Sequence, residues 1–216
     1  MIPFYVCLSI SIIFIILELF FAFIENEKMR KIFKPFRLLG IIACLISFGV
    51  DEKLLYISLS FALIGDVILI FKKNKICFLF GMISFFAGHI VYIALFASLL
   101  TYRVLPWIIV GFTLFGSIFT LSTYKSISQY TKKLTIPGLF YLYILLLETL
   151  FATLLLMDSG SLYALFILGG NIIFVVSDLL IAISYFVVDF KRRDFYIMLT
   201  YIIAQIMIVI GVIMIL

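Results

Sequence analysis

The sequence predicts an all-α membrane protein: a polytopic helical bundle of about eight transmembrane helices, formed by a single integral membrane domain over residues 1–216. Apolar residues make up 66% of the chain and charged residues only 12%, too few to cover the surface of a soluble domain of this length. The mean hydropathy is +1.35. The apolar residues also gather in runs of roughly bilayer length, each bounded by charged or turn residues.

Eight such runs can be followed along the chain. They cover residues 4–24, 35–50, 54–71, 76–100, 104–124, 136–157, 161–188 and 195–216. The first lacks a basic region before it and a small-residue cleavage site after it, so we expect a retained helix and not a signal peptide. The second is short for a membrane span.

Basic residues concentrate in alternate connections, which sets the orientation of a membrane protein. They are Lys28, Arg30, Lys31, Lys34 and Arg37 around the first loop, Lys72, Lys73 and Lys75 in the third, Lys125, Lys132 and Lys133 in the fifth, and Lys191, Arg192 and Arg193 in the seventh. Only Lys53 and Arg103 occupy even-numbered loops. We therefore expect the odd loops in the cytoplasm and both termini outside. Anionic membrane lipids account for the net charge of +5, so neither nucleic acid nor a protein partner is implied.

The two halves of the chain share a pattern. A helix with Asp66 precedes the basic residues 72–75, and a helix with Asp178 precedes the basic residues 191–193. The helices that follow carry His89 and Gln205 at comparable depth. This pattern fits a parallel repeat of four plus four spans, or a patterning common to membrane helices in general.

Ionisable residues within the spans are functional candidates, because burying them in hydrocarbon costs several kcal/mol unless they are neutralised or paired. With loop residues set aside, they are Glu18, Asp66, His89, Glu148 and Asp178. We expect Glu18 to pair with Lys28 or Arg30. The others, together with Gln205, lie at depths that predict one cavity opening toward the cytoplasmic leaflet.

Each candidate also has a structural interpretation, in which the acid or imidazole simply bonds to a neighbouring helix. A single histidine excludes a His-rich metal site, although Asp66, Asp178 and His89 leave a mixed site open. We expect no metal and no cofactor. The three cysteines show no metal-binding spacing and are expected to be packing residues. The motifs of common lipases, zinc peptidases and nucleotide-driven pumps are missing from the sequence.

Five motifs in order carry a family resemblance. They are Lys34-Pro35, LSFALIGDVILI (59–70), FGMISFFAGHIVYIALF (80–96), LGGNIIFVVSDLLIAISYF (168–186) and LTYIIAQIMIVIG (199–211). This order resembles the lysoplasmalogenase-like family of eight-span membrane proteins, the bacterial YhhN type and its animal relatives.

The resemblance implies a multi-pass protein of the bacterial inner membrane that hydrolyses the vinyl ether bond of a lysoplasmalogen, releasing a fatty aldehyde and a glycerophospho-alcohol. The motif positions of the family fall on Lys34, Asp66, His89, Tyr92, Asp178, Tyr201 and Gln205. Glu148 departs from the pattern, because the sixth span of the family is usually apolar or carries methionine.

Vinyl ether hydrolysis needs a proton donor and a nearby negative charge. Our hypothesis gives catalytic roles to Asp66, Asp178 and His89, one aspartate as acid and the other as base, without assigning which. The expected substrate-binding residues are Lys34, Tyr92, Tyr201, Gln205 and Glu148. For Lys34, binding of the lipid phosphate together with Arg37 and ordinary anchoring at the membrane surface are both open.

A small-molecule or proton-coupled transporter is the alternative function, because buried acids at mid-membrane also occur in transporters. It would need access from both faces, whereas the outer halves of these spans are almost wholly apolar. An intramembrane aspartyl protease is a weaker alternative, because the residues before Asp66 lack the first glycine of a GxGD pattern.

Overall fold

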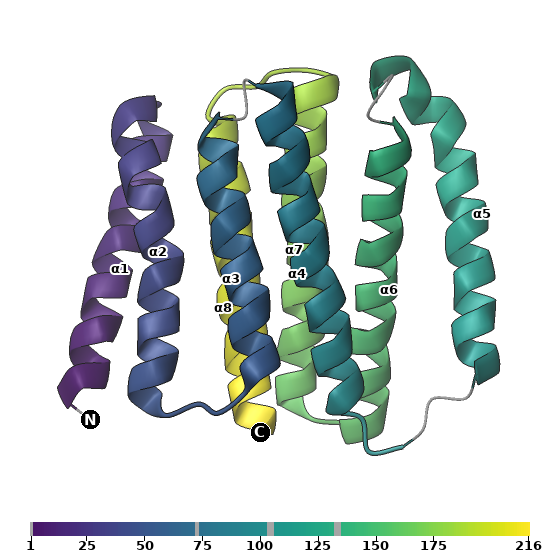
Figure 1. Cartoon of the computed structure of the whole chain (residues 1–216), viewed down its shortest axis with the longest axis horizontal. Coiled ribbons are helices and arrows are strands. Elements are labelled where there is room, and N and C mark those ends of the chain that lie inside the picture. The colour runs from purple at the N-terminus through teal and green to yellow at the C-terminus, as the bar shows by residue number, and fades with distance from the viewer. Residues whose placement is uncertain (1, 72–73, 103–105, 132–134) are drawn as a thin grey trace. The chain divides into compact units, whose positions relative to one another are not determined.

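The computed structural model describes residues 2–71, 74–102, 106–131 and 135–216, and within these ranges it consists of α-helices, one short 3-10 helix and no strand (Figure 1). The helices are α1 (Ile2–Phe23), α2 (Glu27–Phe48), α3 (Lys53–Ile68) continued by η1 (Leu69–Phe71), α4 (Lys75–Ser98), α5 (Pro106–Thr131), α6 (Thr135–Ser159), α7 (Leu162–Phe186) and α8 (Arg193–Ile215). The predicted all-α fold class is confirmed.

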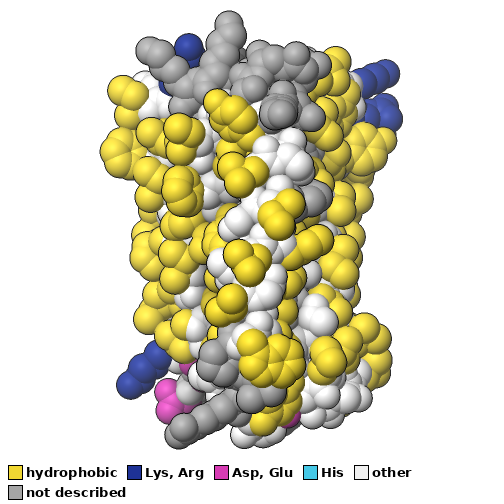
Figure 2. Space-filling model, turned by 90° about the vertical axis from the view of Figure 1, so that its right-hand side faces the viewer, with side chains coloured by type: hydrophobic (Ala, Val, Ile, Leu, Met, Phe, Trp, Pro, Cys, Tyr) yellow, Lys and Arg dark blue, Asp and Glu magenta, His cyan; other side chains and the backbone are white. Residues whose placement is uncertain are grey.

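Six of the described helices are long and apolar enough to cross a membrane: α1, α3 with η1, α4, α6, α7 and α8. The apolar part of α5 is shorter, and α2 carries several charges. Figure 2 views the face that carries α5 and shows hydrophobic side chains along most of it, with the described charged side chains near its ends. Such a face is suited to lipid, and the chain is a helical membrane bundle.

The second helix begins earlier than the predicted span 35–50. Asn26 caps it by accepting a hydrogen bond from the Met29 backbone N–H at 3.2 Å, and Gly49 ends it in the left-handed conformation with φ +82°. The basic residues predicted around the first loop therefore lie within α2. Arg30, Lys34 and Arg37 recur at helical spacing on one buried face. The helix therefore extends before the predicted apolar run, because the charged side chains on this face are buried within the protein.

The first of two compact units comprises residues 1–91 and 190–202. Its helices α1 and α2 run antiparallel along one another (Figure 1). They approach closely at Gly40, where a Cβ atom would lie 2.4 Å from the Ser11 Oγ. Helix α4 approaches α3 at Gly88, and the Ser84 hydroxyl donates a hydrogen bond to the Phe61 carbonyl at 2.6 Å. Small residues thus let these helices pack backbone to backbone.

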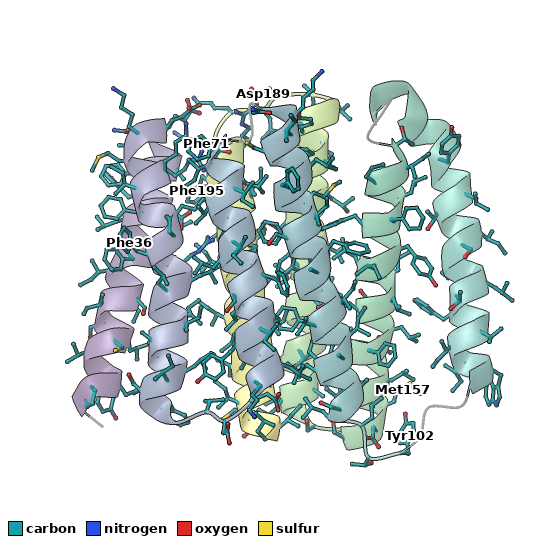
Figure 3. All side chains as sticks on the ribbon, viewed as in Figure 1. Phe36, Phe71, Tyr102, Met157, Asp189 and Phe195 are labelled. Carbon is teal, nitrogen blue, oxygen red and sulfur yellow. The ribbon has the colours of Figure 1, made fainter. Side chains whose placement is uncertain are left out.

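The second unit comprises residues 92–189 and 203–216. Helix α6 contacts both α5 and α7. Gly170 of α7 lies where a Cβ would be 2.9 Å from the Ala204 carbonyl of α8. At one end, near the labelled Tyr102 and Met157 in Figure 3, the Thr101 hydroxyl donates to Asp158 at 2.7 Å. Neither unit corresponds to one half of the chain; the single domain and the four-plus-four repeat stay predictions.

We predict that labelling of single cysteines, in a background without the three native ones, will report the expected orientation. Asn74→Cys and Lys191→Cys should react with a membrane-impermeant thiol reagent only from the cytoplasmic side, because they lie beside clusters of basic residues. Asp51→Cys should react only from the other side. All three positions are exposed. Reaction of Asn74→Cys and Asp51→Cys from the same side would contradict a membrane-spanning α3.

Candidate functional site

Arg37 is the centre of a buried group of charged side chains in the first unit. It lies on α2 and has no exposed surface. One terminal nitrogen, Nη1, lies 3.3 Å from the Glu18 Oε2 of α1, and the other, Nη2, forms an ion pair with the Asp66 Oδ2 of α3. The planar guanidinium therefore bridges two carboxylates on different helices.

Helix α8 contacts the same guanidinium. The Met198 Sδ lies 3.6 Å from the Arg37 Nη1, and the centre of the Tyr201 ring lies 4.5 Å from the Arg37 Cζ. An aromatic face attracts a cation through its quadrupole, most strongly where water is excluded. Residues from α1, α3 and α8 thus converge on one side chain of α2.

Asp66 is held by two cations. The Lys34 Nζ lies 3.1 Å from its Oδ1, while Arg37 binds its Oδ2. Asp66 and Lys34 are both buried. We refer to Glu18, Lys34, Arg37 and Asp66 as the buried ion cluster. Two cations face two anions in this cluster, so it is electrically balanced, as burial in a low-dielectric medium requires.

The local sequence explains how the cluster forms. Lys34 and Arg37 lie one turn apart on the same face of α2, so both side chains can reach one carboxylate. Asp66 follows Gly65, where a Cβ would come within 2.7 Å of the Phe85 ring of α4. The absence of a side chain at Gly65 lets Phe85 pack directly against α3 beside the cluster.

A second group of polar contacts lies at the end of the unit where α1 and α2 meet and α8 begins. Arg30 forms an ion pair with Asp194 at 3.1 Å. The Glu25 carboxylate accepts a hydrogen bond from the Arg192 backbone N–H at 3.0 Å, and the Arg192 guanidinium lies 3.9 Å from the centre of the Phe23 ring. Figure 3 shows Phe71 and Phe195 at this same end. These contacts tie the start of α8 to the α1–α2 turn.

The partner predicted for Glu18 is wrong. Glu18 pairs with Arg37, while the predicted partner Arg30 pairs with Asp194. Helical side chains tilt toward the N-terminus of their own helix. The long Arg37 side chain therefore reaches back toward the α1–α2 turn, where it meets the Glu18 side chain of α1.

Two further predicted residues belong to the first unit. His89 is buried on α4, next to Gly88, where a Cβ atom would lie 3.4 Å from the Ser58 carbonyl of α3. The Tyr201 ring, besides facing Arg37, packs edge-on against Phe85 with ring centres 6.0 Å apart. The structure thus brings Lys34 and Asp66 into direct contact and places Tyr201 against Arg37 of the same cluster.

The remaining predicted residues belong to the second unit. The Tyr92 hydroxyl donates a hydrogen bond to the Gln205 Oε1 at 2.9 Å. The Tyr141 hydroxyl donates to the Asp178 Oδ2 at 2.8 Å. Glu148 has no exposed surface. The structure therefore joins Tyr92 to Gln205, and the cooperation of Asp178 with Asp66 stays a prediction.

The sequence indicates Arg37 as a basic residue near the first loop and as a phosphate ligand beside Lys34, whereas Arg37 forms the centre of the buried ion cluster. It indicates no role for Tyr141. A signal was present, because Arg30, Lys34 and Arg37 share one face of a helix that is otherwise mostly apolar. Nothing in the sequence distinguishes Tyr141 from the many other tyrosines.

Within the described ranges, no group of three or more histidine, cysteine, aspartate or glutamate side chains is arranged to hold a metal ion. The three cysteines are free thiols. The Cys7 Sγ lies 3.4 Å from the Ser47 Oγ, and the Cys44 Sγ lies 3.5 Å from the Ser11 Oγ, so both thiols contribute to the packing of α1 on α2.

The model of the YhhN family matches residues 29–212. The matched region covers most of the chain and holds every predicted site residue, whereas α1 and its Glu18 lie outside it. No curated protein and no solved structure matches the chain.

We predict that Arg37→Lys will destabilise the protein although it keeps the charge. A single ammonium group cannot bridge Glu18 and Asp66 as the planar fork does. The free energy of unfolding should fall by about 1.5–3 kcal/mol, which is typical of one hydrogen bond to a charged group. This loss should appear as a lower thermal midpoint, followed by size-exclusion chromatography in detergent. Lys31→Arg, at a partly exposed position of the same helix, is the control, and equal midpoints for the two variants would contradict the bridging role.

Proposed function

Because the chain belongs to the YhhN family, the lysoplasmalogenase-like family of membrane proteins, we propose that it hydrolyses the vinyl ether bond of lysoplasmalogens. The observation that carries the proposal is a buried carboxylate, Asp66, fixed on both oxygens by Lys34 and Arg37. A carboxylate held away from water is suited to stabilise a developing positive charge. The expected substrate is a 1-alkenyl lysophospholipid.

The reaction defines what the site must supply. A proton is transferred to the β-carbon of the vinyl ether, which leaves an oxocarbenium ion at the ether oxygen and its neighbouring carbon. Water adds to that carbon and loses a proton, giving a hemiacetal. The hemiacetal collapses to a fatty aldehyde and the free hydroxyl of the glycerophospho-alcohol. The first step requires an acid, and the following step requires an anion and a base.

Asp66 is suited to the second role. Its two carboxyl oxygens are paired with the cations Lys34 and Arg37. In our proposal this anion stabilises the oxocarbenium ion and receives the proton of the attacking water. The two cations prevent the carboxylate from turning, so its orientation is set before the substrate binds.

Asp178 is then the proposed acid. The two-aspartate hypothesis needs one carboxyl that delivers a proton, and Asp66 is engaged by cations. The Tyr141 hydroxyl donates to one Asp178 oxygen, which orients the carboxyl. The acid role of Asp178 follows from this division of labour.

The other predicted residues receive supporting roles in this proposal. His89 and Tyr201 orient water or the glycerol hydroxyl, and the hydrogen-bonded pair Tyr92 and Gln205 shapes the substrate site. The contact of Lys34 with Asp66 favours a role in fixing that carboxylate, and phosphate binding by Lys34 is a second proposed role. Glu148, which is buried, stays a proposed substrate-binding residue.

We predict that the purified protein, in detergent and in lipid nanodiscs, will release fatty aldehyde from 1-alkenyl lysophospholipids with choline or ethanolamine headgroups. In D₂O the aldehyde should carry one deuterium on the carbon next to the carbonyl, because that carbon takes up the proton. The saturated 1-alkyl analogue should be inert, since it has no double bond to protonate. The 1-acyl analogue should also be spared, because the proposal includes no acyl-transfer nucleophile.

Mass spectrometry of the aldehyde and of the glycerophospho-alcohol measures all three substrates in one experiment. Protein-free micelles give the background rate. No aldehyde above this background from either headgroup, over a range of pH, would overturn the proposed hydrolase. The buried charges would then favour a transporter, to be assayed in sealed vesicles.

A further inference from the structure

The buried ion cluster draws its charges from two parts of the chain. Lys34, Arg37 and Asp66 lie within residues 29–212, which match the family. Glu18 lies on α1, outside that match. Without Glu18, two cations would face one anion in a region closed to water, and an unbalanced buried charge is costly. An element outside the family match therefore completes the charge balance of the site.

We propose that Glu18 is a positioning residue, which holds the Arg37 guanidinium in the orientation that fixes the Asp66 carboxylate. The consequence for catalysis rests on the proposed function, in which Asp66 acts on the substrate. Glu18 itself touches neither substrate nor water in this proposal. Its effect passes through Arg37.

The geometry favours transmission through the guanidinium. Glu18 binds Nη1 and Asp66 binds Nη2 of the same side chain. Because a guanidinium is planar and rigid, fixing one terminal nitrogen restricts the other. If Glu18 were lost, Arg37 would be free to turn about its side-chain bonds, and its contact with Asp66 would no longer be fixed from two sides.

The ion pair with Arg37 holds the Glu18 carboxylate. It has no exposed surface. Within the described part of the chain, neither of its carboxylate oxygens has a partner in hydrogen-bonding geometry, so the ion pair with Arg37 is the polar contact that holds it. A buried carboxylate without hydrogen bonds is costly, so Glu18 is stable only while Arg37 faces it.

Packing keeps α1 in place for this role. Ser11 lies against Gly40, and the Phe14 ring stacks on Phe36 with centres 5.2 Å apart. Several α1 side chains on other faces, among them Ile13 and Ile16, are exposed and suited to lipid. Glu18 is the one carboxylate, lysine or arginine in α1. A helix that served only as a membrane anchor would not need it.

The first measurement is a double-mutant cycle on thermal stability in detergent, which requires no substrate. Glu18→Gln leaves one cation in excess, Arg37→Gln leaves one anion in excess, and the double variant is balanced again. Each single change should lower the thermal midpoint, and the double variant should lose less than the sum of the two. Additive losses would overturn the proposal. Glu27→Gln, which removes a partly exposed partner of Lys31, is the matched control.

The second measurement is the aldehyde-release rate of the folded protein recovered by size-exclusion chromatography. Glu18→Gln should lower kcat about tenfold to a hundredfold, the range expected for misplacing a reacting group, while KM changes little. Glu18→Asp, which keeps the charge, should recover part of kcat. Glu27→Gln should turn over normally.

A merely structural role would reduce the amount of folded protein and leave its kcat unchanged, and that result would overturn the proposal. If the unmodified protein releases no aldehyde, the proposed function fails, and the stability cycle alone then tests the link between Glu18 and Arg37. A double variant that loses less thermal stability than the sum of the single variants would support that link, and additive losses would overturn it.

Discussion

The charge of Arg37 has to be neutralised inside a helical membrane bundle, and the first compact unit is organised around that requirement. A guanidinium cannot lose its proton under ordinary conditions, so the protein must supply counter-charges and an aromatic face instead. Glu18 and Asp66 provide the charges and Tyr201 the ring. These residues lie on three helices, so one side chain of α2 sets the relative depth of α1, α3 and α8.

This arrangement has a functional consequence. Buried ion pairs often add little net stability, because desolvation offsets the attraction, but they fix groups in one geometry. Here the group that is fixed is Asp66, with a cation on each of its two oxygens. An anion held in this way need not reorganise when a cationic intermediate forms beside it. The charges that constrain the fold are therefore also the ones that fix the carboxylate used in the proposed mechanism.

The fold could be predicted largely from the lengths of the apolar runs, whereas the site could be predicted only in part. The sequence does not show where α2 begins, because Lys34 and Arg37 resemble loop cations until they are seen on one buried face. It does not show the partner of Glu18 either, because sequence distance ignores the direction in which the Arg37 side chain reaches. The contact between Tyr92 and Gln205 joins helices that are far apart in the sequence, and the order of the motifs alone cannot show it.

In the proposed mechanism Asp66 acts as a carboxylate, and the turnover of Asp66→Asn, which keeps the shape and removes the charge, measures that role. We predict a kcat at least about a hundredfold below that of the unmodified protein, as expected for loss of an acid–base group. The variant should still elute as folded protein. Asp194→Asn, which removes the acid paired with Arg30, should retain most of its activity. Near-normal turnover by folded Asp66→Asn would show that the Asp66 charge has no part in catalysis.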